Sequence, residues 1–167
     1  EYLKLLVEKK GVGVIKMEVT RNLEPKDNFL QEVRKLANEN EVVLIFDECT
    51  SGFRKTNGGL HKLYGVEPDI AIFGKALGNG YAITAVVGKE SIMQHAQDSF
   101  ISSTFWTERI GPSAALKTLE IMERDRTWDT ICKQGELLRK KLQQAADSSS
   151  IDIQFNGISS ILGYSIK

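Results

Sequence analysis

The sequence has few of the features that would direct a protein to a membrane or to nucleic acid. Its apolar runs all fall well short of the roughly 20 residues that a transmembrane helix needs. Basic and acidic residues both number 22, so the net charge is zero and binding to nucleic acid or anionic lipid by net charge is excluded. We therefore expect neither nucleic acid nor a membrane as a partner.

Cysteine and histidine are also scarce. The two cysteines, Cys49 and Cys132, are far apart and have no CxxC or metal-ligand spacing. Such isolated cysteines favour a reducing, cytoplasmic setting. His61 and His95 have no partners at ligand spacing, so we expect structural or solvated histidines and no metal site.

What is present is typical of a folded domain. Hydrophobic residues make up 41% and charged residues 26% of the 167 residues, which is typical of globular proteins. The chain begins at Glu1, already within a helical pattern, and ends at Lys167 directly after a strand-like run. We therefore expect a fragment of a longer enzyme.

Hydrophobic periodicity predicts alternating helices and strands over the first 88 residues. A helix is expected in 1–10, and a second opens at Pro25, with apolar residues on one face up to Ala37. Residues 53–68 read as a loop with one helical turn. Strands with little polar alternation are expected at 12–17, 42–46, 70–73 and 83–87; 12–17 is expected to be buried, and 42–46 to be covered on both faces. This order predicts an α/β fold with a parallel sheet flanked by helices.

The second half changes character. Helices are expected at 90–97, after Pro112 and at about 128–146, and two strands at 151–155 and 161–166 are expected to pair. We predict two units: a partial cofactor-binding large domain in 1–125, and the start of a small α+β C-terminal domain in 126–167.

Two charged residues follow neighbouring predicted strands. Asp47 comes directly after 42–46, and Lys75 follows 70–73 by one glycine. Taken singly, Asp47 is as well explained as a capping carboxylate, and Lys75 is better explained as a solvated lysine. Together, at the carboxyl ends of parallel strands, they favour a ligand site. A lysine that forms a Schiff base and a carboxylate for a pyridinium nitrogen are the standard parts of a pyridoxal phosphate site. Glycines at 74, 78 and 80 leave room for a close ligand.

Two segments carry a family resemblance. FDECTSGFR, followed by DIAIFGKALGNGYAITAVVG, resembles the class III (fold-type I) pyridoxal phosphate-dependent aminotransferases, and most of all their glutamate-1-semialdehyde 2,1-aminomutase-like branch. The 28-residue separation of Asp47 and Lys75 suits that family. The resemblance implies pyridoxal 5'-phosphate as cofactor, the mostly parallel large-domain sheet of fold-type I, and a homodimer. It implies amino-group transfer between small-molecule amine and carbonyl substrates, by an aminotransferase or an aminomutase (an isomerase).

The resemblance also implies roles for single residues. Lys75 matches the lysine that binds the cofactor as a Schiff base and later carries a proton. Asp47 matches the carboxylate that pairs with the protonated ring nitrogen. Cys49 occupies a position, usually Val or Ile, that packs on one face of the ring.

A later segment, SSTFWTERIGPSAALKTL, matches the part of the family that reaches the cofactor phosphate of a neighbouring subunit. Its motif is altered here. Thr104 and Thr107 are both candidates, and Thr104 is preferred. We expect Phe105 and Trp106 to lie at an interface rather than at a substrate entrance.

An alternative reading keeps the fold without the chemistry. The family's phosphate-binding turn and the aromatic residue stacked on the ring lie upstream of any segment in this sequence. The chain is then a non-catalytic truncated fragment that does not bind the cofactor. A generic dinucleotide-binding domain is disfavoured, because no GxGxxG follows a strand.

Overall fold

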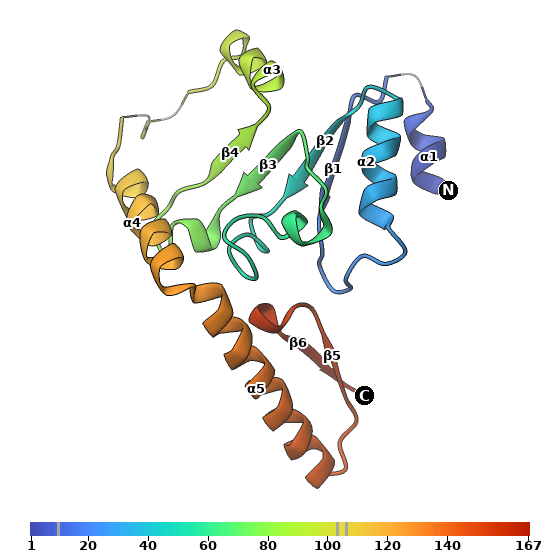
Figure 1. Cartoon of the computed structure of the whole chain (residues 1–167), viewed down its shortest axis with the longest axis vertical. Helices are drawn as coiled ribbons and strands as arrows, with labels where there is room; N and C mark the ends of the chain where they lie inside the picture. The colour runs from blue at the N-terminus through green and yellow to red at the C-terminus, as the bar shows by residue number, and fades with distance from the viewer. Residues whose placement is uncertain (10, 103, 106) are drawn as a thin grey trace.

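The computed structural model describes residues 1–167 except 10, 103 and 106, and its centre is a four-stranded sheet (Figure 1). The strands lie side by side in chain order, β1-β2-β3-β4. The first three are parallel, and β4 runs antiparallel to β3. The strands are β1 (Val14–Glu18), β2 (Val43–Asp47), β3 (Ile70–Phe73) and β4 (Ala85–Gly88). The fold is thus α/β with a mostly parallel sheet, as the sequence predicted.

The antiparallel direction of β4 follows from the short connection that precedes it. Only a one-turn helix, η2 (Lys75–Leu77), and a short loop join β3 to β4. A parallel crossover needs a dozen or more residues and usually a longer helix. The connection is therefore too short to return the chain to the start of the sheet, and β4 pairs in the opposite direction.

One face of the sheet carries the main core. Leu44 and Phe46 on β2 are fully buried, and they pack in one cluster with Leu30, Val33 and Ala37. The last three residues lie on α2 (Phe29–Glu39), which covers this face together with α1 (Tyr2–Val7) (Figure 1). Apolar residues that recur every three or four positions along α2 form this buried stripe.

The opposite face of β1 and β2 is less covered than the sequence suggested. The run 42–46 predicted a strand buried on both faces, yet Val43 and Ile45 are only half-buried. In β1, Val14 is 52% exposed and Lys16 is also exposed, so the expected fully buried strand is buried on one face only. This more open face carries Lys16 and Asp47.

The second half is mostly helical. A short helix, α3 (Glu90–Met93), continues into η3 (Gln94–Asp98), and the long helices α4 (Ile110–Asp125) and α5 (Thr127–Ser148) follow. Arg126 separates α4 from α5 with a left-handed φ of 46°. The helix expected to end at about 146 runs slightly further, because α5 ends at Ser148.

A separate two-stranded sheet closes the chain. β5 (Ile153–Asn156) pairs antiparallel with β6 (Gly163–Ile166), as the sequence predicted. The turn η4 (Ser159–Ile161) between them packs on α5, where an added Cβ at Gly135 would overlap the Ser159 carbonyl oxygen. α5 and this pair extend away from the first sheet (Figure 1). The division at residue 126 stays a prediction.

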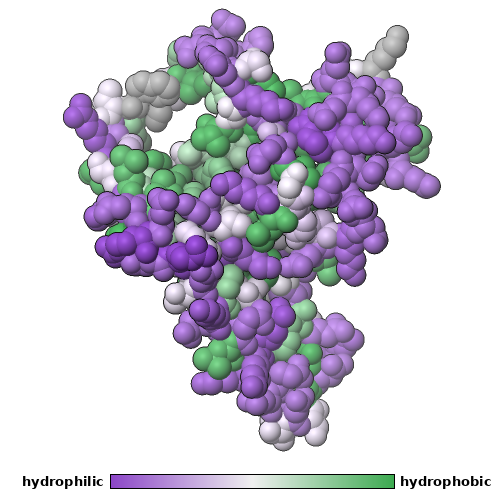
Figure 2. All heavy atoms as spheres, in the orientation of Figure 1, coloured by the Kyte–Doolittle hydropathy of each residue, from purple (hydrophilic) through white to green (hydrophobic). Residues whose placement is uncertain are grey.

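The surface is mixed in character. Figure 2 shows hydrophilic residues over α1 and α2 and hydrophobic residues gathered on the side of β4 and α4. On α4, Leu116 is 70% and Ile110 65% exposed, and Phe100, which follows η3, is 96% exposed. Among the described residues, no helix combines the length and the apolar character needed to cross a bilayer.

Candidate functional site

The ends of β2 and β3 meet at one edge of the sheet. Asp47 is in register with Ile72, and the backbone N–H of Glu48 donates to the Ile72 carbonyl over 2.8 Å. Lys75 follows Ile72 by three residues, so both candidate residues leave the sheet at the same carboxyl edge. Parallel pairing of two apolar strands brings them there, because the carboxyl ends of parallel strands coincide.

Lys75 opens η2 in an uncommon backbone conformation. Its φ is +44°, in the left-handed region that residues other than glycine, asparagine and aspartate seldom occupy. Its exposed side chain donates a hydrogen bond from Nζ to Thr50 Oγ1. Thr50 belongs to the turn that follows β2. This hydrogen bond ties the lysine to the segment that begins with Asp47.

Asp47 is held by two donors. Lys16 Nζ lies 2.8 Å from Asp47 Oδ2, and the backbone N–H of Cys49 donates to Oδ1 over 3.2 Å. The hydrogen bond from Lys16 holds the pKa of the Asp47 carboxyl below its usual range, against an opposing effect of burial. Asp47 is therefore an anion at neutral pH, with 25% of its side chain exposed at this edge.

Cys49 lies beside this carboxylate as a neutral thiol. Burial, and then the neighbouring Asp47, raise the pKa of the Cys49 thiol above its ordinary value. A thiolate is the nucleophilic form of cysteine, so this residue is disfavoured as a nucleophile. Its half-buried side chain is a packing surface next to the site.

The glycines around Lys75 serve the fold itself. A Cβ at Gly74 would lie 3.3 Å from both Cys49 Sγ and Thr84 Cγ2. A Cβ at Gly78 would overlap the Tyr81 carbonyl oxygen. The sequence suggested that these glycines leave room for a ligand, but this space at Gly74 and Gly78 is taken by the protein's own atoms.

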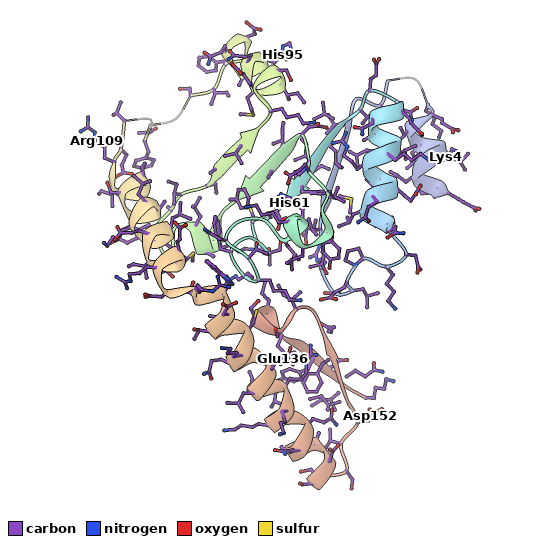
Figure 3. All side chains as sticks on the ribbon, in the orientation of Figure 1. Lys4, His61, His95, Arg109, Glu136 and Asp152 are labelled. Atoms are coloured by element: carbon purple, nitrogen blue, oxygen red, sulfur yellow. The ribbon has the colours of Figure 1, made fainter. Side chains whose placement is uncertain are left out.

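A buried polar cluster lies directly behind Asp47. Glu48 is fully buried and accepts hydrogen bonds from Ser51 Oγ and from the His61 backbone N–H, and it lies 2.8 Å from His61 Nδ1. His61 lies inside the fold, whereas His95 lies at the periphery on η3 (Figure 3). Sequence reasoning missed Glu48. The sequence did carry a signal for it. Two acidic residues in a row follow the apolar run 42–46, and neighbouring side chains of an extended chain point to opposite sides, so only one of the two can face the site.

A second feature that the sequence did not reveal is a cavity beside Lys75. It has a volume of about 650 Å³ and lies between η2, the loop after it and helices α4 and α5. Apolar residues line part of it, and three cationic side chains reach it. Its walls include Phe53, Met122, Ile131, Arg54, Lys75 and Lys117.

The remaining candidates lie elsewhere. Thr104 and Thr107 are exposed and lie in the chain between η3 and α4, outside β2, β3 and η2. The interface expectation for Trp106 falls outside the described residues. Within the described part of the chain, no group of three or more potential metal ligands comes together.

The side chains at this edge fit pyridoxal phosphate. Asp47 is an ionised acceptor of the kind that a protonated ring nitrogen needs. Among the described residues, the hydrogen-bond partner of Lys75 is a hydroxyl rather than a carboxylate, so its amine is not engaged in an ion pair there. An amine in that state can reach a carbonyl group.

Comparisons with known proteins agree with this chemistry. A family model described as "Aminotransferase class-III" matches residues 22–159. A 3-aminobutyryl-CoA aminotransferase from Cloacimonas acidaminovorans is 47% identical over 134 residues, covering 80% of this chain and 32% of that protein. A glutamate-1-semialdehyde 2,1-aminomutase from Hyperthermus butylicus is 36% identical over 141 residues, covering 83% and 33%.

A solved structure shares the fold. The PLP internal aldimine form of the FumI protein from Sphingopyxis sp. matches with a TM-score of 0.85 at 24% identity. The match covers 92% of this chain and 39% of that protein. This chain therefore spans about a third of the length of the two relatives above.

Proposed function

This chain belongs to the class-III aminotransferase family, as its two characteristic segments predicted, and we propose that it carries the amino-group transfer site of a pyridoxal phosphate-dependent enzyme. The observation that supports this most is the meeting of Asp47 and Lys75 at one edge of β2 and β3. The substrates would be a small-molecule amine and a carbonyl compound. Since the relatives include both an aminotransferase and an aminomutase, we keep both reaction types.

Lys75 is the proposed covalent anchor and proton carrier. When bound, pyridoxal phosphate supplies a cationic ring that accepts the electrons of the substrate's C–H bond. The Lys75 amine would hold the cofactor before substrate arrives. Once released, its Nζ would take the α-proton of the substrate and carry it as a general base and acid. Thr50 Oγ1, which accepts a hydrogen bond from Lys75 Nζ, would steady the amine in both roles.

Asp47 is the proposed partner of the ring nitrogen. As an anion it would keep a proton on that nitrogen and so maintain the electron-accepting state. Cys49 would pack its neutral thiol on one face of the ring. Thr104 would bind the cofactor phosphate across a dimer, which fits its place in a separate exposed segment.

We also propose a cytoplasmic homodimer with no nucleic-acid or membrane partner. Exposed apolar residues around α4, among them Phe100, Ile110 and Leu116, support burial against a second subunit. The free cysteines support a reducing compartment, and the zero net charge supports the lack of a nucleic-acid partner.

The test is a labelling experiment on the purified chain. Pyridoxal phosphate is added, the visible absorption is recorded, the adduct is reduced with borohydride, and the modified lysine is located by mass spectrometry. We expect the label on Lys75 and its loss in Lys75→Ala. Lys117→Ala is the matched control, because Lys117 lines the same cavity, and it should keep the label.

The opposite result favours the alternative reading. Absence of the absorption band, or a label scattered over surface lysines in both variants, would mean that the chain keeps the fold without binding the cofactor. Circular dichroism of each variant separates that outcome from a simple loss of folding.

A further inference from the structure

Lys16 is an unusual residue for its place in the sheet. Strands of parallel sheets are mostly apolar, yet a lysine occupies the middle of β1. Lys16 is in register with Ile45, two residues before Asp47 on the neighbouring strand. Because alternate residues of a strand share a face, Lys16 and Asp47 are diagonal neighbours on the same side of the sheet. A long side chain can span that diagonal.

The contact between the two side chains is direct. Lys16 Nζ lies 2.8 Å from Asp47 Oδ2, while Oδ1 is occupied by the Cys49 backbone N–H. A carboxylate has about four lone-pair positions, so each oxygen can still accept a further donor. The two existing donors hold the carboxylate group in one orientation, and this orientation sets where its free lone pairs point.

Other charged groups act on the same pair. Glu18 lies on the same face of β1 as Lys16 and adds to the negative potential at its ammonium. Cys49 faces the pair as a neutral thiol, and the positive charge of Lys75 acts on that thiol from η2. Arg21 also belongs to this group, because its Nη1 lies 3.8 Å from Glu18 Oε1.

We propose that Lys16 is a positioning residue of the site. Its ammonium orients the Asp47 carboxylate and keeps it ionised, and it stays bound to this carboxylate while the ring nitrogen of the cofactor binds it as well. This inference rests on the proposed function, in which Asp47 meets that nitrogen. Lys16 touches neither the cofactor nor substrate in this scheme and acts only through Asp47. Through Asp47, Lys16 lowers the pH up to which the ring nitrogen of the cofactor stays protonated.

The first test needs no cofactor. The Asp47 carboxyl is titrated by carbon-13 NMR in the cofactor-free 167-residue chain. We expect Lys16→Met to raise the pKa of Asp47, because the hydrogen bond that lowers it is lost, and Lys16→Arg to leave it unchanged. Lys35→Met is the control, since it removes an exposed, paired lysine from the other side of the sheet. An Asp47 titration identical in wild type and Lys16→Met would overturn the proposal.

The second measurement follows the loaded chain. The protonation of the ring nitrogen is monitored with nitrogen-15-labelled cofactor. Because Lys16 competes for the same carboxylate, Lys16→Met should let the ring hold its proton to higher pH, and Lys16→Arg should restore the wild-type titration. If Lys16 had only a structural role, Lys16→Met would lower the thermal stability and leave the titration of the ring nitrogen unchanged.

Failures of the two proposals are distinguishable. If wild type binds no cofactor at Lys75, the proposed function fails, and the cofactor-free titration still decides whether Lys16 controls Asp47. If the cofactor binds and neither titration responds to Lys16→Met, the role of Lys16 alone is wrong.

Discussion

Glu48 and His61 are joined twice within the core. The Glu48 Oε1 atom accepts the His61 backbone N–H over 3.0 Å and lies 2.8 Å from His61 Nδ1. Since an ionised carboxylate only accepts hydrogen bonds, Nδ1 must carry the ring proton in this pair. Glu48 directly follows Asp47, and successive side chains of a strand point to opposite faces. One acidic side chain is therefore anchored inside the fold, and its neighbour is presented at the site.

Stability at acid pH should depend on Glu48. Burial raises the pKa of its carboxyl, but the hydrogen bonds from His61 and Ser51 outweigh burial and leave the pKa below its ordinary value. The unfolded chain therefore takes up the proton first as the pH falls. The contribution of Glu48 is complete above its unfolded pKa of about 4.3 and is lost below it, toward the folded pKa.

We expect Glu48→Gln to lower the free energy of unfolding by about 1–3 kcal/mol at neutral pH and to flatten its acid dependence. Urea unfolding between about pH 3 and pH 7 measures both effects. Glu67→Gln is the control, because its exposed carboxylate lies 3.8 Å from the other ring nitrogen of His61. An unaltered acid slope in Glu48→Gln would contradict this assignment.

Asp69 connects α2, β2 and the residue between β4 and α3 through one buried carboxylate. Its oxygens lie 2.8 Å from Arg34 Nη1, 2.7 Å from Lys89 Nζ and 2.8 Å from the Leu44 backbone nitrogen. Only 8% of the Asp69 side chain and 16% of the Arg34 side chain are exposed. Asp69→Ala leaves these donors unpaired, and we expect a loss of about 3–5 kcal/mol in urea unfolding.

The partner variant Lys89→Ala provides the comparison. The Lys89 side chain is 55% exposed, so its ion pair with Asp69 contributes less than about 1 kcal/mol to the free energy of unfolding. Equal losses in Asp69→Ala and Lys89→Ala would show that the contact with Arg34 and Leu44 contributes little.

Cofactor affinity should depend on the charge of Asp47. Replacement by asparagine keeps the shape and removes the anion that would meet the ring nitrogen. A hydrogen bond to a charged group contributes about 1.5–3 kcal/mol, so Asp47→Asn should weaken cofactor binding roughly ten- to a hundredfold. An absorbance titration gives the Kd. Asp152→Asn, which alters an exposed residue before β5, should leave it unchanged. Wild-type affinity in Asp47→Asn would be incompatible with the proposed role.

The packing of the C-terminal strands on α5 should fail in Gly135→Ala. The added methyl group would overlap the backbone carbonyl of Ser159, which no side-chain rotation can relieve. Alanine is the better helix former by about 1 kcal/mol, so any destabilisation comes from this clash. We expect a loss of about 1–3 kcal/mol, with faster hydrogen exchange in β5 and β6. Lys141→Ala, on an exposed position of α5, should change neither measurement.

Much of the fold could be predicted from local pattern. The strand 70–73 and the pairing of the two last strands were predicted as they occur, and α5 was predicted to within about two residues. Periods of two and of 3.6 residues are local signals, and the apolar runs here are long enough to show them. Asp47 at the end of one strand and Lys75 one glycine after the next are equally local signals, so both residues could be singled out. Their catalytic roles stay a prediction.

Only the tertiary structure decided the contacts between distant segments. The reversed direction of β4 depends on the short path from Phe73 to Ala85, and the burial of Glu48 depends on the loop that brings His61 to it. Lys16 meets Asp47 because the register of β1 against β2 places them diagonally on one face, although 31 residues separate them in the chain. A sequence pattern records which residues share a face of one element. Which faces meet, and in what register, is set by the packing of whole elements against one another.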